Sequence, residues 1–234
     1  MNLILLFKED FIAPRRVRLL GRRKDHIQSI LKSKTAEDLC VGLCNGQIGR
    51  GIVAASGETV DLDVSFNQPP PAPLPLTLIL ALPRPPVFKR VLQCAASLGI
   101  KKIIVLNFNR VEKSLWNSSV LKPQAIEEQL ALGLEQSKDT MMPEVILQRR
   151  FKPFVLDQMP DLIKGTLPLI AHPVSHGHCP RGVKGPVTLM IGPEGGIIGD
   201  EIGLLIQQGF KPVDLGPRIL KVESVLPFIV GRMF

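Results

Sequence analysis

The chain has 234 residues, 45% of them hydrophobic, which is enough for one large or two modest folded domains. No apolar run approaches the roughly 20 residues that a membrane-spanning helix needs, so a membrane-embedded class is excluded. One Trp, ten Phe and no Tyr leave few side chains for stacking, so binding of a polyanion would rely on the net charge of +8.

Much of this charge lies near the N-terminus. Between Lys8 and Lys34 there are nine basic and three acidic residues, which gives the segment a charge of +6. Such a local excess is typical either of a solvated surface or of a surface that binds phosphates. A charge count alone leaves both interpretations open.

The first 68 residues predict a small barrel-like module of antiparallel strands. A short helix is expected over residues 24–31. Strands are expected at 39–44, 47–55 and 59–66, separated by Asn45-Gly46 and Ser56-Gly57. An Asn-Gly pair between apolar alternations is a strong signal for a hairpin turn. We therefore predict one domain over residues 1–68.

A proline-rich linker follows at residues 69–75. Five of the eight residues from Gln68 to Pro75 are proline, which disfavours both a helix and an internal strand. The linker separates the barrel-like module from a second domain at residues 76–234.

The second domain alternates apolar strands with amphipathic helices, a pattern that indicates an α/β fold with a parallel sheet. Helices are expected from 87 to 98 with Gly99 as the stop, from Pro123 onward, and from 200 to 208. The predicted strands lie at 76–82, 103–106, 167–171, 187–191 and 212–215.

The cysteines and histidines favour neither disulfides nor a metal. Four cysteines lack a CxxC pair, which indicates reduced thiols in a cytoplasmic protein, with Cys40 and Cys44 packing in a strand. His172, His176, His178 and Cys179 fall within eight residues, but without the paired spacing of a zinc site. We expect no metal.

Two predicted strands end in unusual turns. Residues 187–191 run into Gly192-Pro193-Glu194-Gly195-Gly196, and the strand near residue 213 runs into Gly216-Pro217-Arg218. Ligands of open α/β sheets bind at the carboxyl ends of strands, and glycine lets the backbone approach a ligand closely. Two such turns could hold a nucleoside, although the first is also compatible with an ordinary turn before a helix. Neither matches a familiar phosphate-binding loop.

Together, residues 191–196 (IGPEGG) and 215–224 (LGPRILKVES) resemble the C-terminal signature of the ribosomal RNA small subunit methyltransferase E family. The resemblance extends over most of the chain. Residues 23–27 (RKDHI), 93–99 (QCAASLG), 135–137 (EQS) and 143–145 (PEV) are similar to further family segments.

The resemblance implies a fold and an activity. The fold is a PUA-like β-barrel followed by a SPOUT-type domain whose C-terminal segment forms a trefoil knot. The activity is methylation of N3 of one uridine in 16S rRNA of the small ribosomal subunit, with S-adenosyl-L-methionine as cofactor. The resemblance also implies a cytoplasmic homodimer.

Three sets of site residues are expected for such an enzyme. The RNA-binding set comes from the basic N-terminal segment and is Arg15, Arg16, Arg22, Arg23 and Lys24. The catalytic set is Arg218, Lys221 and Glu223, with the cations stabilising negative charge on the uracil. The cofactor-binding set is Leu169, His172, Pro173, Ile191, Gly192, Pro193, Glu194, Gly195, Gly196, Leu215, Gly216, Arg218, Ile219 and Leu220.

Some positions depart from the family pattern: Lys221-Val222 replaces Arg-Thr, Ser97 replaces Glu, and Arg84-Pro85-Pro86 replaces a Lys-Gly-Asp type of loop. A lysine lacks the bidentate fork of arginine, so the substrate could be oriented differently. Two alternatives therefore stay open. One is a knotted methyltransferase for another RNA position, and the other is an RNA-binding protein that has lost its donor site.

Overall fold

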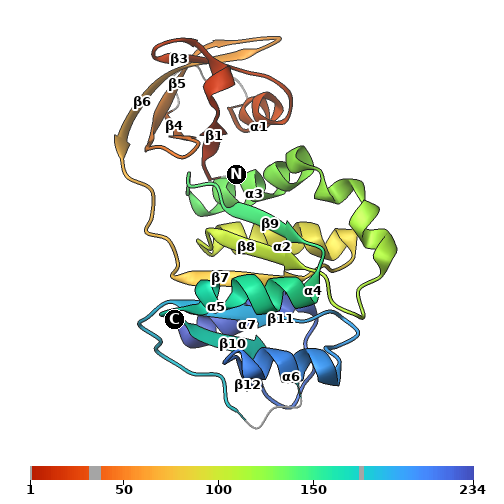
Figure 1. Cartoon of the computed structure of the whole chain (residues 1–234). Helices are drawn as coiled ribbons and strands as arrows, with labels where there is room; N and C mark the ends of the chain where they lie inside the picture. Colours follow the sequence, from red (N-terminus) through yellow and green to blue (C-terminus); the bar gives the residue numbers. More distant parts are fainter. Residues whose placement is uncertain (1, 32–37, 174–176) are drawn as a thin grey trace. The chain divides into compact units, whose positions relative to one another are not determined.

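The computed structural model describes residues 2–31, 38–173 and 177–234 (Figure 1). Lys32, Lys34 and His176, which the sequence interpretation included, lie outside these ranges. The chain forms two compact units. The first unit is Met1–Ala72 with Ala131–Met142, and the second is Pro73–Leu130 with Pro143–Phe234. The first unit thus includes a segment from the middle of the chain.

A six-stranded curled sheet forms most of the first unit (Figure 1). Its spatial order is β1-β4-β5-β6-β3-β2, and α1 (Gly21–Leu31) follows β3. The short helix η1 covers Lys8–Asp10. The strands are β1 (Ile4–Leu6), β2 (Phe11–Ala13), β3 (Arg16–Leu19), β4 (Asp38–Leu43), β5 (Ile48–Ser56) and β6 (Val60–Gln68).

The pairing of this sheet is antiparallel except between β1 and β4, which run parallel. The prediction of an antiparallel module was wrong at that pair. A parallel neighbour needs a long connection, and β2, β3 and α1 supply it. The predicted turn between β4 and β5 is confirmed, with Asn45 at a φ of 58°. Alternate residues of the strands, together with Ile27 of α1, form a buried apolar core.

Residues 131–142 are tied to the first unit by backbone hydrogen bonds. The amides of Asn2 and Leu3 both donate to the carbonyl of Glu135 at 3.0 Å. The amide of Asn45 donates to the carbonyl of Thr140 at 2.8 Å. Gly42 leaves room for Thr140, since a Cβ there would lie 2.4 Å from the Thr140 Cγ2 atom. The segment therefore belongs to the packed interior of this unit.

The second unit is built on a parallel six-stranded sheet in the order β12-β10-β11-β7-β8-β9 (Figure 1). Every neighbouring pair is parallel, which confirms the predicted sheet type. The central strand β11 is buried along its whole length, as expected for a sheet covered on both faces. The strands are β7 (Leu76–Ala81), β8 (Lys102–Leu106), β9 (Glu144–Gln148), β10 (Leu167–Ala171), β11 (Val187–Ile191) and β12 (Lys211–Val213).

Helices cover both faces of this sheet. Figure 1 shows α2 and α7 behind it and α4 and α5 in front, as right-handed connections require. The longest helix is α3 (Pro123–Ser137), whose residues from Ala131 onward count with the first unit. The other helices are α2 (Pro85–Ser97), η2 (Lys113–Asn117), η3 (Ser119–Leu121), α4 (Phe151–Pro153), η4 (Phe154–Gln158), α5 (Met159–Ile163), α6 (Gly199–Gln207) and α7 (Val222–Met233).

Several predicted helix boundaries are confirmed. Pro123 opens α3, and Gly99 follows α2 with a φ of 81°, whereas α2 begins at Pro85, two residues before its predicted start. Such a left-handed residue after a helix favours glycine. All four cysteines are free thiols. Within the described ranges, no helix is long and apolar enough to cross a membrane.

Candidate functional site

A cavity of about 800 Å³ opens at the carboxyl edge of the parallel sheet, beside β7, β10 and β11. This is the edge at which ligands of open α/β sheets bind. The loops after β10, β11 and β12 contribute most of the lining, and α2 and α7 contribute the rest. The lining residues are Arg84, Val87, Arg90, Ala171, His172, Pro173, Ile191, Gly192, Pro193, Glu194, Gly196, Ile197, Val213, Leu215, Gly216, Arg218, Ile219, Leu220, Lys221, Val222, Glu223 and Val225.

The two glycine-bearing turns lie side by side around this cavity. Gly196 and Gly216 have φ angles of 78° and 112°, a region that side chains other than glycine rarely adopt. Gly192 is required for a different reason, because a Cβ there would lie 2.6 Å from the Ile197 Cγ1 atom. The turn geometry thus brings backbone amides and carbonyls to the cavity wall.

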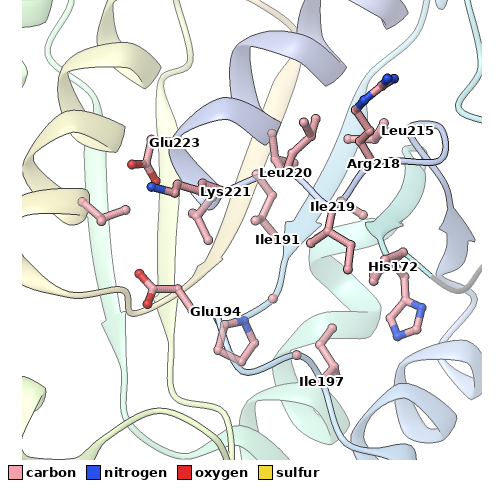
Figure 2. A pocket seen from close by; sticks show the side chains of 18 of the residues that line it. His172, Ile191, Glu194, Ile197, Leu215, Arg218, Ile219, Leu220, Lys221 and Glu223 are labelled. Carbon is pink, nitrogen blue, oxygen red and sulfur yellow. The ribbon is translucent and has the colours of Figure 1, made fainter.

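Apolar side chains form the floor of the cavity. Figure 2 shows Ile191, Ile197 and Leu220 around the open space between the loops. Ile219 also reaches toward this space, and 86% of its surface is exposed. Exposed backbone groups above an apolar floor suit a ligand with both flat apolar and polar parts.

Most of the predicted cofactor-binding residues line the cavity. His172 and Pro173 enter from the loop after β10, where the His172 amide donates to the Val213 carbonyl at 3.0 Å. Leu169, three residues before His172, is buried within β10 and is not among the lining residues. Gly195 packs against Arg110, and its carbonyl accepts a hydrogen bond from that guanidinium.

The predicted catalytic residues occupy different parts of the cavity wall. Figure 2 shows Lys221 and Glu223 on one side, with the guanidinium of Arg218 directed away from them. Glu223 accepts a hydrogen bond from Arg90 Nη2 at 3.3 Å. The sequence interpretation missed Arg90 and Arg84. The position of Arg84 shortly after β7, the neighbour of β11, is a signal that could have found it, whereas Arg90 lies within α2 and reaches Glu223 because α2 packs against α7.

Arg84 lies between two carboxylates at the entrance. Its Nε atom is 3.9 Å from Glu194 Oε2, and its Nη2 atom is 3.7 Å from Glu112 Oε1. All three side chains are about half exposed or more, so these long contacts contribute little to stability. They do show that the loops after β8 and β11 approach each other at this edge.

A buried carboxylate joins those two loops. Glu201, the third residue of α6, is 7% exposed. Its Oε1 accepts from the Asn109 amide at 2.7 Å, and its Oε2 accepts from the Ile198 amide at 3.5 Å. The second contact is the return half of a helix capping box. With Arg110 bound to the Gly195 carbonyl, three hydrogen bonds hold the glycine turn in place.

Comparison with protein families matches residues 70–233 to the RNA methyltransferase domain. That match covers most of the chain, including every residue that lines the cavity. The chain belongs to this family. The match places the glycine turns and the cavity inside a domain that modifies RNA.

Curated relatives of this RNA methyltransferase bear out the resemblance found in the sequence. Ribosomal RNA small subunit methyltransferase E of Treponema pallidum is 26% identical over 231 residues, covering 96% of this chain and 87% of the relative. Ribosomal RNA small subunit methyltransferase E 1 of Borreliella burgdorferi is 28% identical over 141 residues, covering 60% of this chain and 59% of that protein. The second match thus spans less than two thirds of the relative.

Solved structures share the fold of this RNA methyltransferase. A Legionella pneumophila methyltransferase with bound cofactor SAM has a TM-score of 0.75, with 22% identity over 99% of this chain and 96% of that one. The ribosomal RNA small subunit methyltransferase E of Neisseria gonorrhoeae, bound to S-adenosyl methionine, has a TM-score of 0.74, with 20% identity over 98% of this chain and 96% of that one.

The predicted RNA-binding residues of this methyltransferase mostly contact its own carboxylates. Arg16 makes two hydrogen bonds to Asp63, at 2.8 and 2.9 Å. Arg23 likewise makes two to Asp10 and lies 5.5 Å from the centre of the Phe7 ring. The other contacts are Arg22 Nη1 to Glu135 Oε2 at 2.8 Å and Lys24 Nζ to Asp25 Oδ1 at 3.2 Å.

Arg15 is the exception. It is exposed, and its side chain has no hydrogen-bond or ion-pair partner among the described residues. Three paired acids outside the N-terminal segment, Asp61, Asp63 and Glu135, thus offset half of its +6.

Two histidines of the loop after β10, His172 and His178, lie within the described residues. His178 Nδ1 lies 3.5 Å from Asp214 Oδ2, and His172 lines the cavity. Among the residues that the structure describes, no group of three His, Cys, Asp or Glu side chains is arranged to hold an ion.

Proposed function

We propose that this RNA methyltransferase transfers the methyl group of S-adenosyl-L-methionine to N3 of a uridine in 16S rRNA of the small ribosomal subunit. The observation that carries the proposal is the open cavity between two glycine turns at the carboxyl edge of a parallel sheet. The curated relatives named for small-subunit rRNA methylation support the substrate class. The two solved structures with bound donor support the cofactor.

The residues present fit this donor. A volume of about 800 Å³ lies within the roughly 300–1,000 Å³ that small-molecule and cofactor sites occupy. Gly192, Gly196 and Gly216 would offer backbone groups to the nucleoside, and Ile191, Ile197 and Leu220 would contact its flat faces. The remaining cofactor-binding residues of the sequence interpretation complete the same site in this proposal. When bound, the donor supplies an electrophilic methyl group.

Catalysis in this proposal depends mainly on positioning. Loss of the N3 proton to solvent leaves a negative charge on the uracil that is shared with the flanking carbonyl oxygens, and N3 would then form its bond to the methyl carbon as the bond from that carbon to sulfur breaks, which leaves a neutral thioether. Lys221 lies on the cavity wall with its amine free to approach that charge. Arg218 would need to turn inward to do the same, because its guanidinium points away from Lys221 in Figure 2. Glu223 contacts Arg90 and would position that arginine rather than accept the proton.

We also propose a fold type for each of the two units. We assign the curled sheet of the first unit to the PUA-like barrels that bind RNA, with Arg15 as the contact and Arg16, Arg22, Arg23 and Lys24 beside it.

We also assign a trefoil knot to the second unit. From β12 at the sheet edge the chain reaches α7, which packs on α2, and the Val183 amide donates to the Met233 carbonyl at 2.8 Å. The connection between β10 and β11 therefore lies against the end of α7.

We further propose a cytoplasmic homodimer. Phe228 and Phe234 of the C-terminal segment are 45% and 43% exposed, and Ile219 beside the donor cavity is 86% exposed. Exposed large apolar side chains can supply the apolar area of a contact site, and this supports the proposal. Analytical ultracentrifugation tests the proposal, and a sedimentation coefficient of a 25.7 kDa monomer at micromolar concentration would contradict it.

The deciding experiment compares rRNA from cells with and without this protein. Nuclease digestion and mass spectrometry should show the loss of one N3-methyluridine. Loss of a ribose methyl group or another methylated base would favour the alternative target instead. Calorimetric titration of the purified protein with S-adenosyl-L-methionine tests the donor site separately, and absence of binding would favour an RNA-binding protein without activity.

The catalytic assignment has its own test. Lys221→Ala should lower kcat by about 100-fold, the usual effect of removing one group that stabilises transition-state charge. Arg218→Ala should have a smaller effect because of its outward orientation. Normal methylation by Lys221→Ala at saturating donor would remove Lys221 from the catalytic set.

A further inference from the structure

The carboxyl edge of the parallel sheet carries more positive charge than the donor cavity itself requires. Strands β7, β8 and β9 end level with one another, since Ala81, Leu106 and Gln148 are in register. A basic group follows each of the three ends. We name these residues the arginine rim: Arg84 after β7, Arg110 after β8, and Arg149, Arg150 and Lys152 after β9.

Contacts between the loops show that the rim is continuous. Arg84 lies between Glu194 and Glu112, which connects the donor cavity to the loop after β8. Within that loop, Trp116 Nε1 donates to Asn107 Oδ1 at 2.8 Å. Arg149 then donates to the Trp116 carbonyl at 2.9 Å and lies 5.5 Å from the centre of its ring. Strands are spaced about 4.8 Å apart, so the rim extends roughly 10 Å from β7 to β9.

Apart from Arg84, the rim cations contact no carboxylate among the described residues. Arg110 and Arg149 donate to backbone carbonyls, which carry no net charge. Arg150 and Lys152 are exposed, and neither side chain has a hydrogen-bond or ion-pair partner within the described ranges. In the described part of the chain, the carboxylates in contact with the rim are Glu112 and Glu194, both through long contacts with Arg84. The rim thus keeps positive charge, whereas paired acids offset half of the +6 of the N-terminal segment.

We propose that the arginine rim binds the RNA backbone beside the target nucleotide. The inference rests on the proposed function, because a base that enters the donor cavity brings its flanking phosphates to the cavity entrance. The rim begins at that entrance and leads away across β7, β8 and β9. Guanidinium groups bind phosphate oxygens through paired donors, and the donors that Arg110 and Arg149 do not use internally remain available. Arg150 and Lys152 form the distal end of the contact.

The test compares two double variants that remove the same charge from opposite edges of one sheet. Arg150→Ala with Lys152→Ala removes the distal rim. Lys164→Ala with Lys211→Ala is the matched control, because both lysines are exposed and lie just before β10 and at the start of β12, at the amino edge. Fluorescence anisotropy with a single-stranded RNA oligonucleotide measures affinity across salt concentrations, and methylation of small-subunit rRNA measures turnover.

We expect the rim variant to lose about ten-fold in RNA affinity near physiological salt. Its plot of log affinity against log salt should become shallower by about 1.4, which is 0.7 for each lost contact to single-stranded RNA. Donor binding by calorimetry should equal that of the wild type, and the control variant should match the wild type in all measurements. The charge-reversing pair Arg150→Glu and Lys152→Glu should weaken RNA binding further.

Several outcomes would contradict RNA binding by the arginine rim without contradicting the proposed function. The rim and control variants could bind and methylate RNA equally well, or the rim variant could lose donor binding as strongly as RNA binding. Normal binding of free RNA with slow methylation of assembled subunits alone would instead indicate a ribosomal protein as the partner. If the wild type neither binds the donor nor methylates rRNA, the proposed function itself fails.

Discussion

The arginines of the two units differ in what their guanidinium groups contact. In the first unit, Arg16, Arg18 and Arg23 each form paired hydrogen bonds with an aspartate. In the second unit, Arg110 and Arg149 contact backbone carbonyls at the carboxyl edge of the sheet. An arginine that is paired with an aspartate contributes mainly to local structure. An arginine that donates to a neutral backbone carbonyl has a charge that is not compensated and can attract an anionic ligand. The number of basic residues in a segment therefore does not measure its capacity to bind RNA.

The comparison predicts that substitutions at the carboxyl edge impair binding without impairing the fold. The largest effect is expected for Gly192→Val. Its Cβ would lie 2.6 Å from Ile197 Cγ1, and its methyl groups would enter the cavity. Because the methyl groups occupy space that the donor needs, donor affinity measured by calorimetry should fall by about 100-fold, which is about 2.8 kcal/mol. Gly199→Ala is the control, because a Cβ there meets nothing within 4 Å.

In the first unit, a substitution is expected to lower folding stability without changing donor affinity. Glu135 is 2% exposed, and its carboxylate contacts Arg22 at 2.8 Å and the Leu5 amide at 3.4 Å. Glu135→Ala leaves that amide without its acceptor and should lower the free energy of unfolding by about 2 kcal/mol. Donor affinity should stay unchanged. Glu128→Ala, an exposed position on the same helix, should change neither quantity, and an equal loss there would contradict the assignment.

A smaller effect on the donor is expected at Glu201, which positions the glycine turn rather than touching the cavity. Glu201→Gln keeps one acceptor oxygen but weakens the contact with the Asn109 amide. The KM for the donor should rise about ten-fold, a change of about 1.4 kcal/mol, while kcat stays near the wild-type value. Asp200→Asn tests whether any charge change at the start of α6 does the same. An equal fall in kcat for Glu201→Gln would indicate a different role.

Local turn chemistry made part of this structure predictable. Asn45, Gly99 and Pro123 each have a conformational preference that acts within a few residues, and the structure uses each as expected. The glycine turns after β11 and β12 were found in the same way. Their adjacency follows from strand order, because both strands flank β10 in the sheet.

Long-range pairing could not be read from the sequence. Arg22 and Glu135 are more than 100 residues apart, and only the folded first unit brings them together. The strands β1, β2, β3 and β9 also escaped prediction, because segments of three to five residues are too short to show a clear periodicity. Arg90 was missed since its role depends on the packing of α2 against α7.

The smallest expected effect concerns acid stability and tests whether the ion pairs of the first unit contribute to folding. The hydrogen bonds from Arg18 lower the pKa of Asp61 below its ordinary value of 3.8, and those from Arg16 lower the pKa of Asp63 in the same way. The folded state thus binds fewer protons than the unfolded state near these values. The resulting stability is complete above pH 3.8 and is lost as the pH falls through the lower folded values.

Urea unfolding of the wild type and of the double variant Asp61→Asn, Asp63→Asn measures this contribution. The difference in free energy of unfolding should be constant near neutral pH and should shrink as the solution is acidified below pH 3.8. It should also shrink with added salt, because Arg16 and Asp63 are about half exposed. A difference that is zero at neutral pH would show that these pairs leave the arginines available to RNA. The contrast between the two units would then disappear.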